Sequence, residues 1–259
     1  MNIGLIGAGA IAHFLLEEIN QKQQDNLHIT SIFVRDKEKY QRLEEDFGIK
    51  LFTDLDAFLD LEIDIVVEAA DINAVKVLVP SIIKRKNVVV ISVGALADEG
   101  LLAEINDLTD KYKNEVYLPS GAIGGLDLIQ NAHALGTVTS VSLTTRKPAR
   151  SLIDKDINEP KVVFEGSAVD AIGQFPKNMN VSIILSLAGI GMDKTNVRLI
   201  ADPHIEKNIH HMEVAGDFGE AVFTIQNNPL PENPKTSYLA AMSILGTLKR
   251  INGKLKIGG

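Results

Sequence analysis

The glycine turn at the start of the chain constrains the fold more than any other feature. Residues 7–12 read GAGAIA, which fits the pattern G-x-G-x-x-[GA]. They follow an apolar run at 2–6, which predicts a strand, and they open a segment at 10–21 whose apolar residues recur at helical spacing. In such a turn the first glycine permits the tight bend, and the second lets the backbone approach a pyrophosphate. A purely structural turn is the alternative, because a lone match is weak. The strand–turn–helix context favours dinucleotide binding and predicts contacts from Gly7, Gly9, Ala10 and Ile11.

The rest of the first half repeats the same strand-and-helix alternation. Further strands are predicted at 28–34, 51–52, 64–69, 87–93 and 116–119. Helices are predicted between them at 37–47, 54–59, 73–85 and 99–113. Strands that alternate with helices of this length predict an α/β fold, with a Rossmann-type doubly wound parallel sheet.

The pattern changes after residue 120. Strand-like segments follow one another at 137–145, 161–164, 196–202, 209–216 and 221–226, with a helix at 180–188 and a proline-rich connection at 228–234. This order predicts a C-terminal α+β domain with a mostly antiparallel sheet. We therefore expect a dinucleotide-binding domain at 1–119, a substrate, catalytic and oligomerisation domain at 120–235, and a C-terminal helix at 236–259 that packs back on the first domain. An open antiparallel sheet leaves one face exposed unless another surface packs on it. We therefore expect a homodimer or larger homo-oligomer, in which a second copy of the chain covers that face.

Composition excludes several classes of function. The 259 residues contain no cysteine, which rules out disulfides, a thiolate nucleophile and cysteine-ligated metals. The formal net charge of −8 argues against nucleic acid as a partner, because phosphate binding needs clustered Lys and Arg. No apolar run reaches the roughly 18 residues of a membrane helix, and no basic segment precedes the first apolar run. We expect a cytoplasmic protein that binds neither membrane nor metal.

The residues after the second predicted strand should select between NAD and NADP. An acidic side chain there binds the adenosine ribose, whereas an arginine accommodates a 2′-phosphate. If the strand ends at Phe33, the selecting position is Val34 with Arg35 beside it, which favours NADP or dual use. If Asp36 reaches the ribose, NAD is favoured, but Asp36 is also placed to cap the next helix. The sequence leaves this choice open.

Candidates for chemistry follow the strands of the predicted sheets. Ala69 ends one strand of the first sheet, and a small-residue loop at 119–125 leaves the first domain. Three of the six histidines lie within 204–211, where solvated loop residues are the alternative to catalysis. His210 and His211 point to opposite faces of a strand and so cannot share a metal ion. Two adjacent cations, Arg146 and Lys147, suit a dicarboxylate substrate, although an exposed strand end is equally consistent with them.

Several longer motifs resemble the L-aspartate dehydrogenase family. They cover nearly the whole chain and read GLIGAGAIA, VVEAA, ISVGALAD, LPSGAIGGLD, TTRKP, FPKNMNV, the run from ADPHIEKNIHHMEV to GDFG, and NNPLPENPKTS. The resemblance implies NAD- or NADP-dependent oxidative deamination of L-aspartate to iminoaspartate, which hydrolyses to oxaloacetate and ammonia. The reaction is reversible, and the iminoaspartate can feed NAD biosynthesis through quinolinate.

The resemblance also implies roles for individual residues. His210 matches the catalytic histidine of the NxHxxEV motif, and Ala122 and Asn180 match nucleotide contacts. Asn180 is also a candidate for substrate binding, with Arg146 and Lys147. His211 stands where relatives often have Glu, and its role is open. The alternatives are a related two-domain oxidoreductase, such as a homoserine dehydrogenase or a dihydrodipicolinate-type reductase, and a non-catalytic dinucleotide sensor.

Overall fold

A parallel six-stranded sheet forms the centre of the first of two units in the computed structural model. The structure describes residues 1–23, 26–176, 179–255 and 257. The first unit comprises Met1–Pro119 and Ile244–Lys256, and the second comprises Ser120–Ser243 and Ile257–Gly259. The last helix, α10 (Tyr238–Asn252), begins in the second unit, and from Ile244 onward it belongs to the first.

The sheet of the first unit has the strand order β3-β2-β1-β4-β5-β6, and all neighbours are parallel. Its strands are β1 (Asn2–Ile6), β2 (His28–Phe33), β3 (Lys50–Phe52), β4 (Ile65–Glu68), β5 (Asn87–Val90) and β6 (Val116–Tyr117). Strands β2 and β3 are added on one side of β1, and β4, β5 and β6 on the other, so the strand order reverses between β1 and β4. Ligands of such sheets bind at that point, outside the carboxyl ends of the strands. The predicted doubly wound fold is confirmed.

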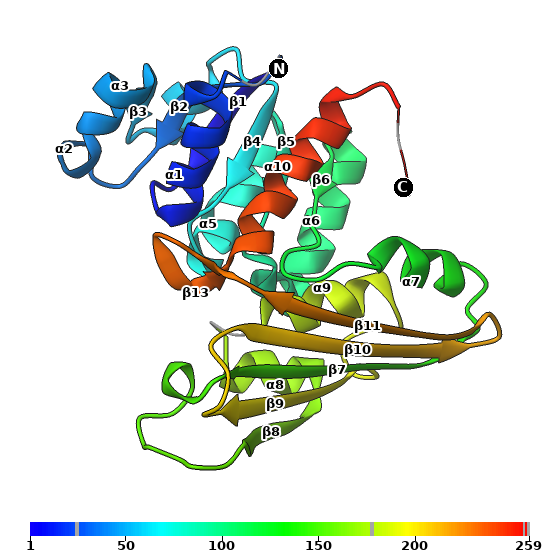
Figure 1. Ribbon diagram of the computed structural model, residues 1–259. Coiled ribbons are helices and arrows are strands. Elements are labelled where there is room, and N and C mark those ends of the chain that lie inside the picture. The colour runs from blue at the N-terminus through cyan, green and yellow to red at the C-terminus, as the bar shows by residue number, and fades with distance from the viewer. Residues whose placement is uncertain (24–25, 177–178, 256, 258–259) are drawn as a thin grey trace. The chain divides into compact units, whose positions relative to one another are not determined.

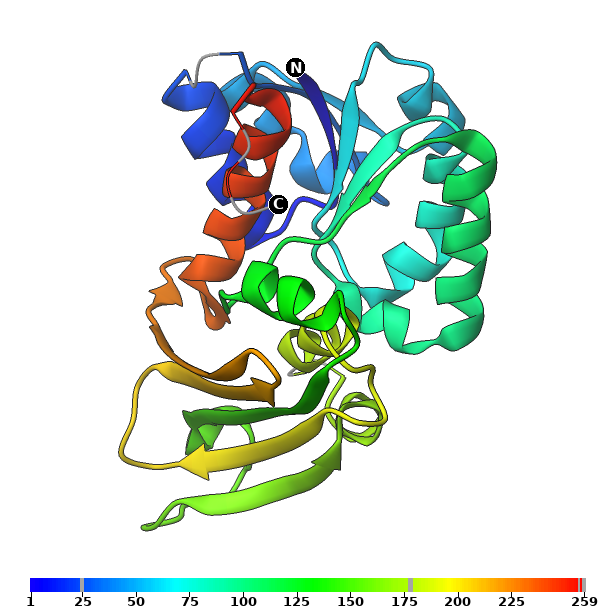
Figure 2. The same ribbon diagram turned by 90° about the vertical axis from the view of Figure 1, so that its right-hand side faces the viewer.

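Helices cover both faces of this sheet. They are α1 (Ala10–Leu16), α2 (Lys37–Tyr40), α3 (Arg42–Phe47), α4 (Leu55–Leu59), α5 (Ile72–Ile83) and α6 (Glu99–Tyr112), with a π-helical turn η1 (Glu17–Gln21) and a 3₁₀ turn η2 (Val93–Ala97). In Figures 1 and 2, α1 and the later part of α10 lie on one face, and α5 and α6 lie on the other. The aliphatic strands between these layers, such as β4 and β5, are almost fully buried.

Three predicted elements of this unit differ from the structure by more than one or two residues at an end. The helix predicted at 10–21 becomes π-helical after Leu16, and the helix predicted at 37–47 is interrupted at Gln41. The strand predicted at 87–93 ends at Val90. It ends there because the backbone N–H and the hydroxyl of Ser92 both bind the Glu68 carboxylate instead of continuing the ladder.

A five-stranded sheet organises the second unit, in the order β11-β10-β7-β9-β8. Its strands are β7 (Val138–Pro148), β8 (Lys161–Ser167), β9 (Asn196–Asp202), β10 (Asn208–Gly216) and β11 (Gly219–Asn227). Only the β7–β9 pair is parallel, so the predicted mostly antiparallel sheet is confirmed. Helices α8 (Ala168–Gln174) and α9 (Asn180–Ala188) lie on one face of this sheet (Figure 2), and α7 (Leu126–His133) contacts α9.

The sequence did not predict α7, α8 or the 3₁₀ turn η3 (Ala149–Ser151). The two helices span only seven or eight residues each, and α7 directly follows two glycines. The segment predicted as a proline-rich connection forms the small hairpin of β12 (Pro229–Leu230) and β13 (Asn233–Ser237).

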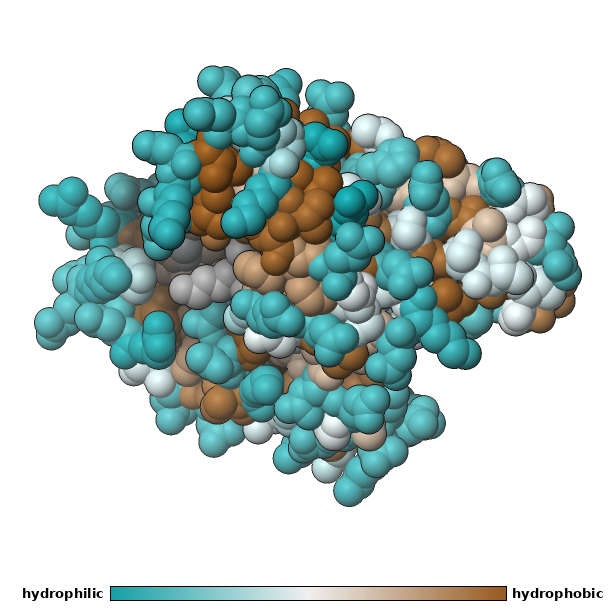
Figure 3. Space-filling view, turned by 90° about the horizontal axis from the view of Figure 1, so that it is seen from below, coloured by the Kyte–Doolittle hydropathy of each residue, from teal (hydrophilic) through white to brown (hydrophobic). Residues whose placement is uncertain are grey.

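In the part of the chain that the structure covers, no helix is both long and apolar enough to cross a membrane. Figure 3 shows a surface on which hydrophilic residues predominate between smaller apolar patches.

Candidate functional site

The first glycine of the turn is required by the fold of the first unit. Gly7 follows β1 with φ +92°, a left-handed conformation that residues with a Cβ rarely adopt. Its N–H donates to the Phe33 carbonyl at 3.0 Å. A Cβ at this position would lie 2.9 Å from the Ala70 Cβ. The turn therefore places β1 tightly against the end of β4, and both the positive φ and this close approach require glycine even without a ligand.

The second glycine has a different role. Gly9 caps α1 with an ordinary φ of −87°, and a Cβ added to it would meet no atom within 4 Å. Nothing in the packing of the described residues therefore requires glycine here. The space beside its backbone is open, as the close approach of a pyrophosphate demands. Ala10 and Ile11 form the first two positions of α1, so their N–H groups lie at the positive end of that helix.

An open cavity of about 600 Å³ extends from this turn along the carboxyl ends of β1, β2 and β4. Five residues predicted to bind the cofactor line it together, namely Gly7, Gly9, Arg35, Asp36 and Ala69. Its size is that of a ligand pocket, and it lies at the reversal point of the strand order. The open space at Gly9 and this position show that the residues present fit a dinucleotide.

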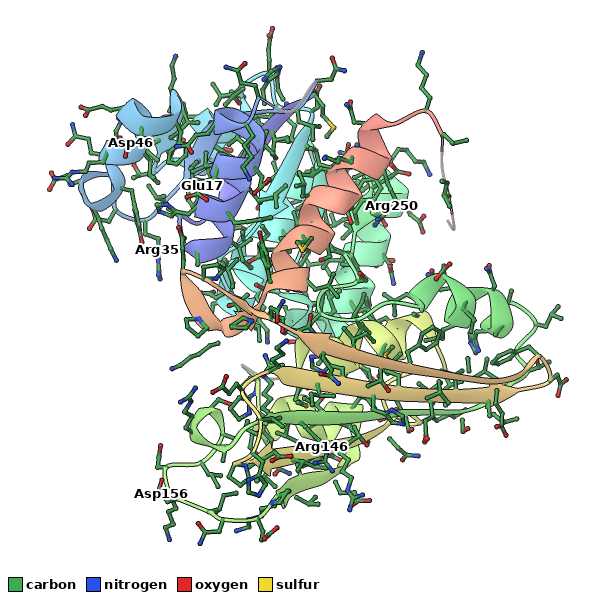
Figure 4. The ribbon with its side chains drawn as sticks, viewed as in Figure 1. Glu17, Arg35, Asp46, Arg146, Asp156 and Arg250 are labelled. Atoms are coloured by element: carbon green, nitrogen blue, oxygen red, sulfur yellow. The ribbon has the colours of Figure 1, made fainter. Side chains whose placement is uncertain are left out.

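Two carboxylates on the wall of this cavity serve as helix caps. Asp36 accepts the Lys39 N–H at 3.1 Å at the start of α2, and Asp71 accepts the Ala74 N–H at 2.8 Å at the start of α5. The same wall carries the cations of Arg35 and Lys39. Arg35 extends from the loop after β2 in Figure 4.

A buried carboxylate ties together the loops behind the cavity. Glu68 is 1% exposed, and its oxygens accept from the Ala70 N–H at 2.9 Å and from the Ser92 N–H and hydroxyl at 3.0 Å each. Burial raises the pKa of Glu68, and these hydrogen bonds oppose the rise. The network fixes the loops after β4 and β5 relative to each other.

The predicted catalytic histidine lies on the buried face of the sheet in the second unit. His210 of β10 is 2% exposed and pairs across the strands with Thr145 of β7. Its Nδ1 lies 3.0 Å from the Thr145 Oγ1. Lys147 lies two residues further along β7, so its side chain is on the same face as Thr145 and His210. Thr145 is 0% exposed and Lys147 8%.

Electrostatics keep the imidazole of this cluster neutral. Burial and the charge of Lys147 lower the pKa of His210 to about 3. Burial also lowers the pKa of Lys147 to about 8. Around pH 7 the cluster therefore contains a neutral imidazole beside a lysine that still carries its proton.

The second predicted cation points the other way. Arg146 lies on the opposite face of β7, where its Nη1 donates to the Asp202 carboxylate at 2.7 Å. The structure thus does not bring Arg146 and Lys147 together, because neighbouring residues of a strand face opposite sides of the sheet. His211 also lies on this opposite face, with Nδ1 at 2.8 Å from the Thr224 hydroxyl.

Two predicted nucleotide contacts belong to the second unit. Ala122 is buried, and its carbonyl accepts from the Asn227 Nδ2 at 3.0 Å. Asn180 is the first residue of α9. Within the FPKNMNV motif, residues 177 and 178 lie outside the described part of the chain.

Among the residues of these sites that sequence reasoning missed are Thr145, Glu68, Lys39 and Tyr40. Two had a readable signal. Thr145 lies two residues from Lys147 in the TTRKP motif, so strand alternation alone puts them on one face. Glu68 is a lone carboxylate in the otherwise apolar VVEAA. In the described residues, no group of three or more His, Asp or Glu side chains is placed to hold a metal ion.

Two family models match the chain. Residues 127–251 match the model described as aspartate dehydrogenase, C-terminal. Residues 7–119 match the model described as homoserine dehydrogenase, NAD binding domain. The second match covers the NAD-binding domain and gives no information about the substrate.

Full-length relatives and solved structures agree with the first of these models. The L-aspartate dehydrogenases of Methanococcus maripaludis and Methanosarcina mazei are 36% and 39% identical to the chain, with 100% of this chain and 99% of each relative covered. The crystal structure of aspartate dehydrogenase from Thermotoga maritima is 30% identical, with a TM-score of 0.79 and 99% of both chains covered. Scyllo-inositol dehydrogenase from Lactobacillus casei, at 13% identity and TM-score 0.53 over 86% of this chain and 74% of that one, shows the fold alone.

Proposed function

The chain belongs to the L-aspartate dehydrogenase family, and on that premise we propose that it catalyses the NAD(P)-dependent oxidative deamination of L-aspartate. The reaction converts L-aspartate, NAD(P)⁺ and water into oxaloacetate, ammonia and NAD(P)H, with iminoaspartate as the intermediate. In the reverse direction the enzyme aminates oxaloacetate. We include in this proposal that the iminoaspartate can supply NAD biosynthesis.

The buried cluster of His210, Thr145 and Lys147 carries the proposal. It combines a neutral base with a cation on one face of a sheet, and the acidic amino acid substrate requires both. A protein that only sensed a dinucleotide would not need this pair in its second unit, where burying a lysine is costly.

His210 has the role of general base. When its Nδ1–H donates to the Thr145 hydroxyl, the lone pair of Nε2 is available for a proton. It removes a proton from the substrate ammonium, which frees the nitrogen lone pair that expels hydride from Cα. The bound nicotinamide cofactor supplies the hydride acceptor. After His210 has released that proton to solvent, it takes a proton from the water that attacks the imine carbon and returns it to the amino group, which leaves as ammonia.

Lys147 binds a substrate carboxylate in this proposal. Its ammonium is on the same face as His210, and a charge-assisted hydrogen bond to a carboxylate contributes about 1.5–3 kcal/mol. The negative charge of the bound substrate also raises the pKa of His210 from its low value in the free protein. Ala122 remains a proposed contact of the cofactor, and Asn180 of the cofactor and the substrate. Arg146 is bound to Asp202 and is not part of the catalytic cluster.

The assay that tests this function follows absorbance at 340 nm. The purified protein is mixed with L-aspartate, L-homoserine or buffer alone, and each mixture receives NAD or NADP. Aspartate-dependent reduction of either cofactor supports the proposal. Reduction with homoserine but not with aspartate overturns the substrate, and no reduction with any mixture, despite cofactor binding, overturns the activity.

We propose in addition that the protein acts as a cytoplasmic homodimer or larger homo-oligomer. The open face of the second sheet supports this association, because it exposes Val162 and Val222 and also carries the Arg198–Glu165 and Arg146–Asp202 ion pairs. Light scattering coupled to size-exclusion chromatography tests it. A mass of twice 28.1 kDa or a higher multiple is expected, and a monomer at micromolar concentration contradicts it.

A further inference from the structure

The cavity at the end of β2 contains the groups that would distinguish the two nicotinamide dinucleotides. We propose that this cavity selects the 2′-phosphorylated form, NADP(H), and that Arg35 and Lys39 bind its 2′-phosphate. This inference deepens the proposed function, because it names the cofactor of the same site. Its test measures binding without substrate and so stands apart from the test of the reaction.

The first argument is the residue at the selecting position. An enzyme specific for NAD places a carboxylate directly after β2, where it accepts hydrogen bonds from the ribose hydroxyls. Here β2 ends at Phe33, and the next residue is Val34, whose side chain is 3% exposed and lines the cavity. Its N–H donates to the Phe52 carbonyl at 2.8 Å, which fixes this position at the end of the ladder. An aliphatic side chain cannot accept a hydrogen bond from a ribose.

The second argument concerns the nearest carboxylate. Asp36 lies two positions beyond Val34, and its Oδ1 accepts the Lys39 N–H at the start of α2. Its backbone is extended, with φ −137° and ψ 105°, as a helix cap requires. Asp36 thus has a structural function that accounts for its presence without a ribose.

The third argument is the pair of cations. Arg35 and Lys39 both line the cavity, and among the described residues neither of them forms an ion pair. The Lys39 ammonium lies 5.2 Å from the centre of the Tyr40 ring, which also lines the cavity. The neighbouring Lys37, by contrast, pairs with Glu44 at 3.1 Å and is not part of the lining. A guanidinium and an ammonium on one wall match the charge of a phosphate monoester.

Fluorescence titration with NADPH and NADH tests the proposal on the full chain. Wild-type protein is expected to bind NADPH at least tenfold more tightly than NADH. Arg35→Ala and Lys39→Ala should each raise the Kd for NADPH about tenfold, as expected for the loss of one charge-assisted hydrogen bond, and leave the Kd for NADH within about twofold. Lys37→Ala is the matched control, and both of its Kd values should stay unchanged. Competition by adenosine 2′,5′-bisphosphate should exceed competition by adenosine 5′-monophosphate in the wild type only.

Two further variants, at Asp36 and Val34, test how these positions contribute to the preference between NADPH and NADH. Asp36→Asn keeps a capping side chain, so it should leave NADH binding unchanged if Asp36 is only a cap. Val34→Asp adds the missing ribose acceptor and should reverse the preference toward NADH. Tighter binding of NADH by the wild type overturns the proposal, and so does an equal loss of both cofactors in Arg35→Ala. A protein that binds NADPH selectively but does not oxidise aspartate leaves this inference standing and removes the proposed reaction.

Discussion

The two units of this protein build their sites in opposite ways. In the first unit the part of the site at the glycine turn consists of backbone and open space: a left-handed Gly7, an open Gly9 and the ends of three parallel strands. In the second unit the site consists of buried side chains, with His210, Thr145 and Lys147 on alternate positions of two strands. The comparison teaches that the backbone geometry of a dinucleotide-binding turn can be predicted from a short stretch of sequence, because a single turn supplies that geometry. A catalytic cluster depends on strand register, which only the assembled sheet provides.

Removal of the imidazole from the side-chain site should have the largest effect. His210→Ala is expected to lower kcat at least 100-fold, because the proposed general base is lost, while the Kd for NADPH stays within about twofold. Stopped-flow and steady-state rates with L-aspartate provide the measurement. The control is His211→Ala, since His211 is the next residue and lies on the opposite face of the sheet. Near-normal kcat in His210→Ala would refute the assignment.

Replacement of the buried cation should be the next largest effect. Lys147→Met keeps an unbranched side chain one atom shorter and removes the charge, and the KM for L-aspartate is expected to rise about 10–100-fold. Arg146→Met serves as the comparison, because its charge pairs with Asp202 on the other face. Similar KM changes in both variants would mean that the face of the strand does not decide substrate binding.

The glycine turn permits a sharper comparison within the backbone-built site. Gly9→Ala should leave the thermal midpoint almost unchanged, because its Cβ meets no atom, yet raise the cofactor Kd about tenfold. Gly7→Ala should instead lower the thermal midpoint, since it combines a positive φ with a contact of 2.9 Å. Calorimetry and cofactor titration of both variants measure the two effects. A large loss of stability in Gly9→Ala would show that the open space at this glycine is needed for folding.

The smallest expected effect is a pH dependence that originates in the second unit. The pKa of Lys147 is lowered to about 8, so its charge is present below that pH and lost above it. The value of kcat/KM for L-aspartate should therefore fall about fourfold between pH 7 and 8.5 in the wild type, and this limb should be absent in Lys147→Met. Unfolding of the protein by the titration of Lys147 cannot cause this fall in kcat/KM. The unfolded chain holds this proton up to about pH 10.4, so the titration of Lys147 raises the free energy of unfolding over the same interval. An identical limb in Lys147→Met would assign it to another group.

Most of the first unit could be predicted from the sequence. Each strand, turn and helix of a doubly wound sheet has its own local sequence pattern. Once strands and helices are seen to alternate, a parallel sheet covered by helices follows. The errors came where a side chain overrode the pattern. Residues 91–93 read as a strand, but Ser92 binds the Glu68 carboxylate across the sheet and ends the ladder.

The second unit was less predictable, because its short elements depend on contacts distant in the sequence. The sequence indicated an antiparallel sheet but missed α7 and α8, which are too short for helical periodicity to be decisive. It placed Arg146 and Lys147 in one substrate site, although strand alternation separates them. The Thr145 partner of His210 is 65 residues away, a contact that no local motif encodes.

By itself, the sequence determined that the chain begins with a dinucleotide turn, continues as an α/β sheet and ends in a mostly antiparallel domain with the motifs of one family. These properties follow from local periodicity, from glycine at positions that need it and from residue types at fixed spacing. The tertiary structure alone decided which side chains meet. It put Lys147 beside His210 and Arg146 beside Asp202 in the second sheet. The physical reason is that the face and register of a side chain are set by pairing between distant strands, and no single segment specifies that pairing.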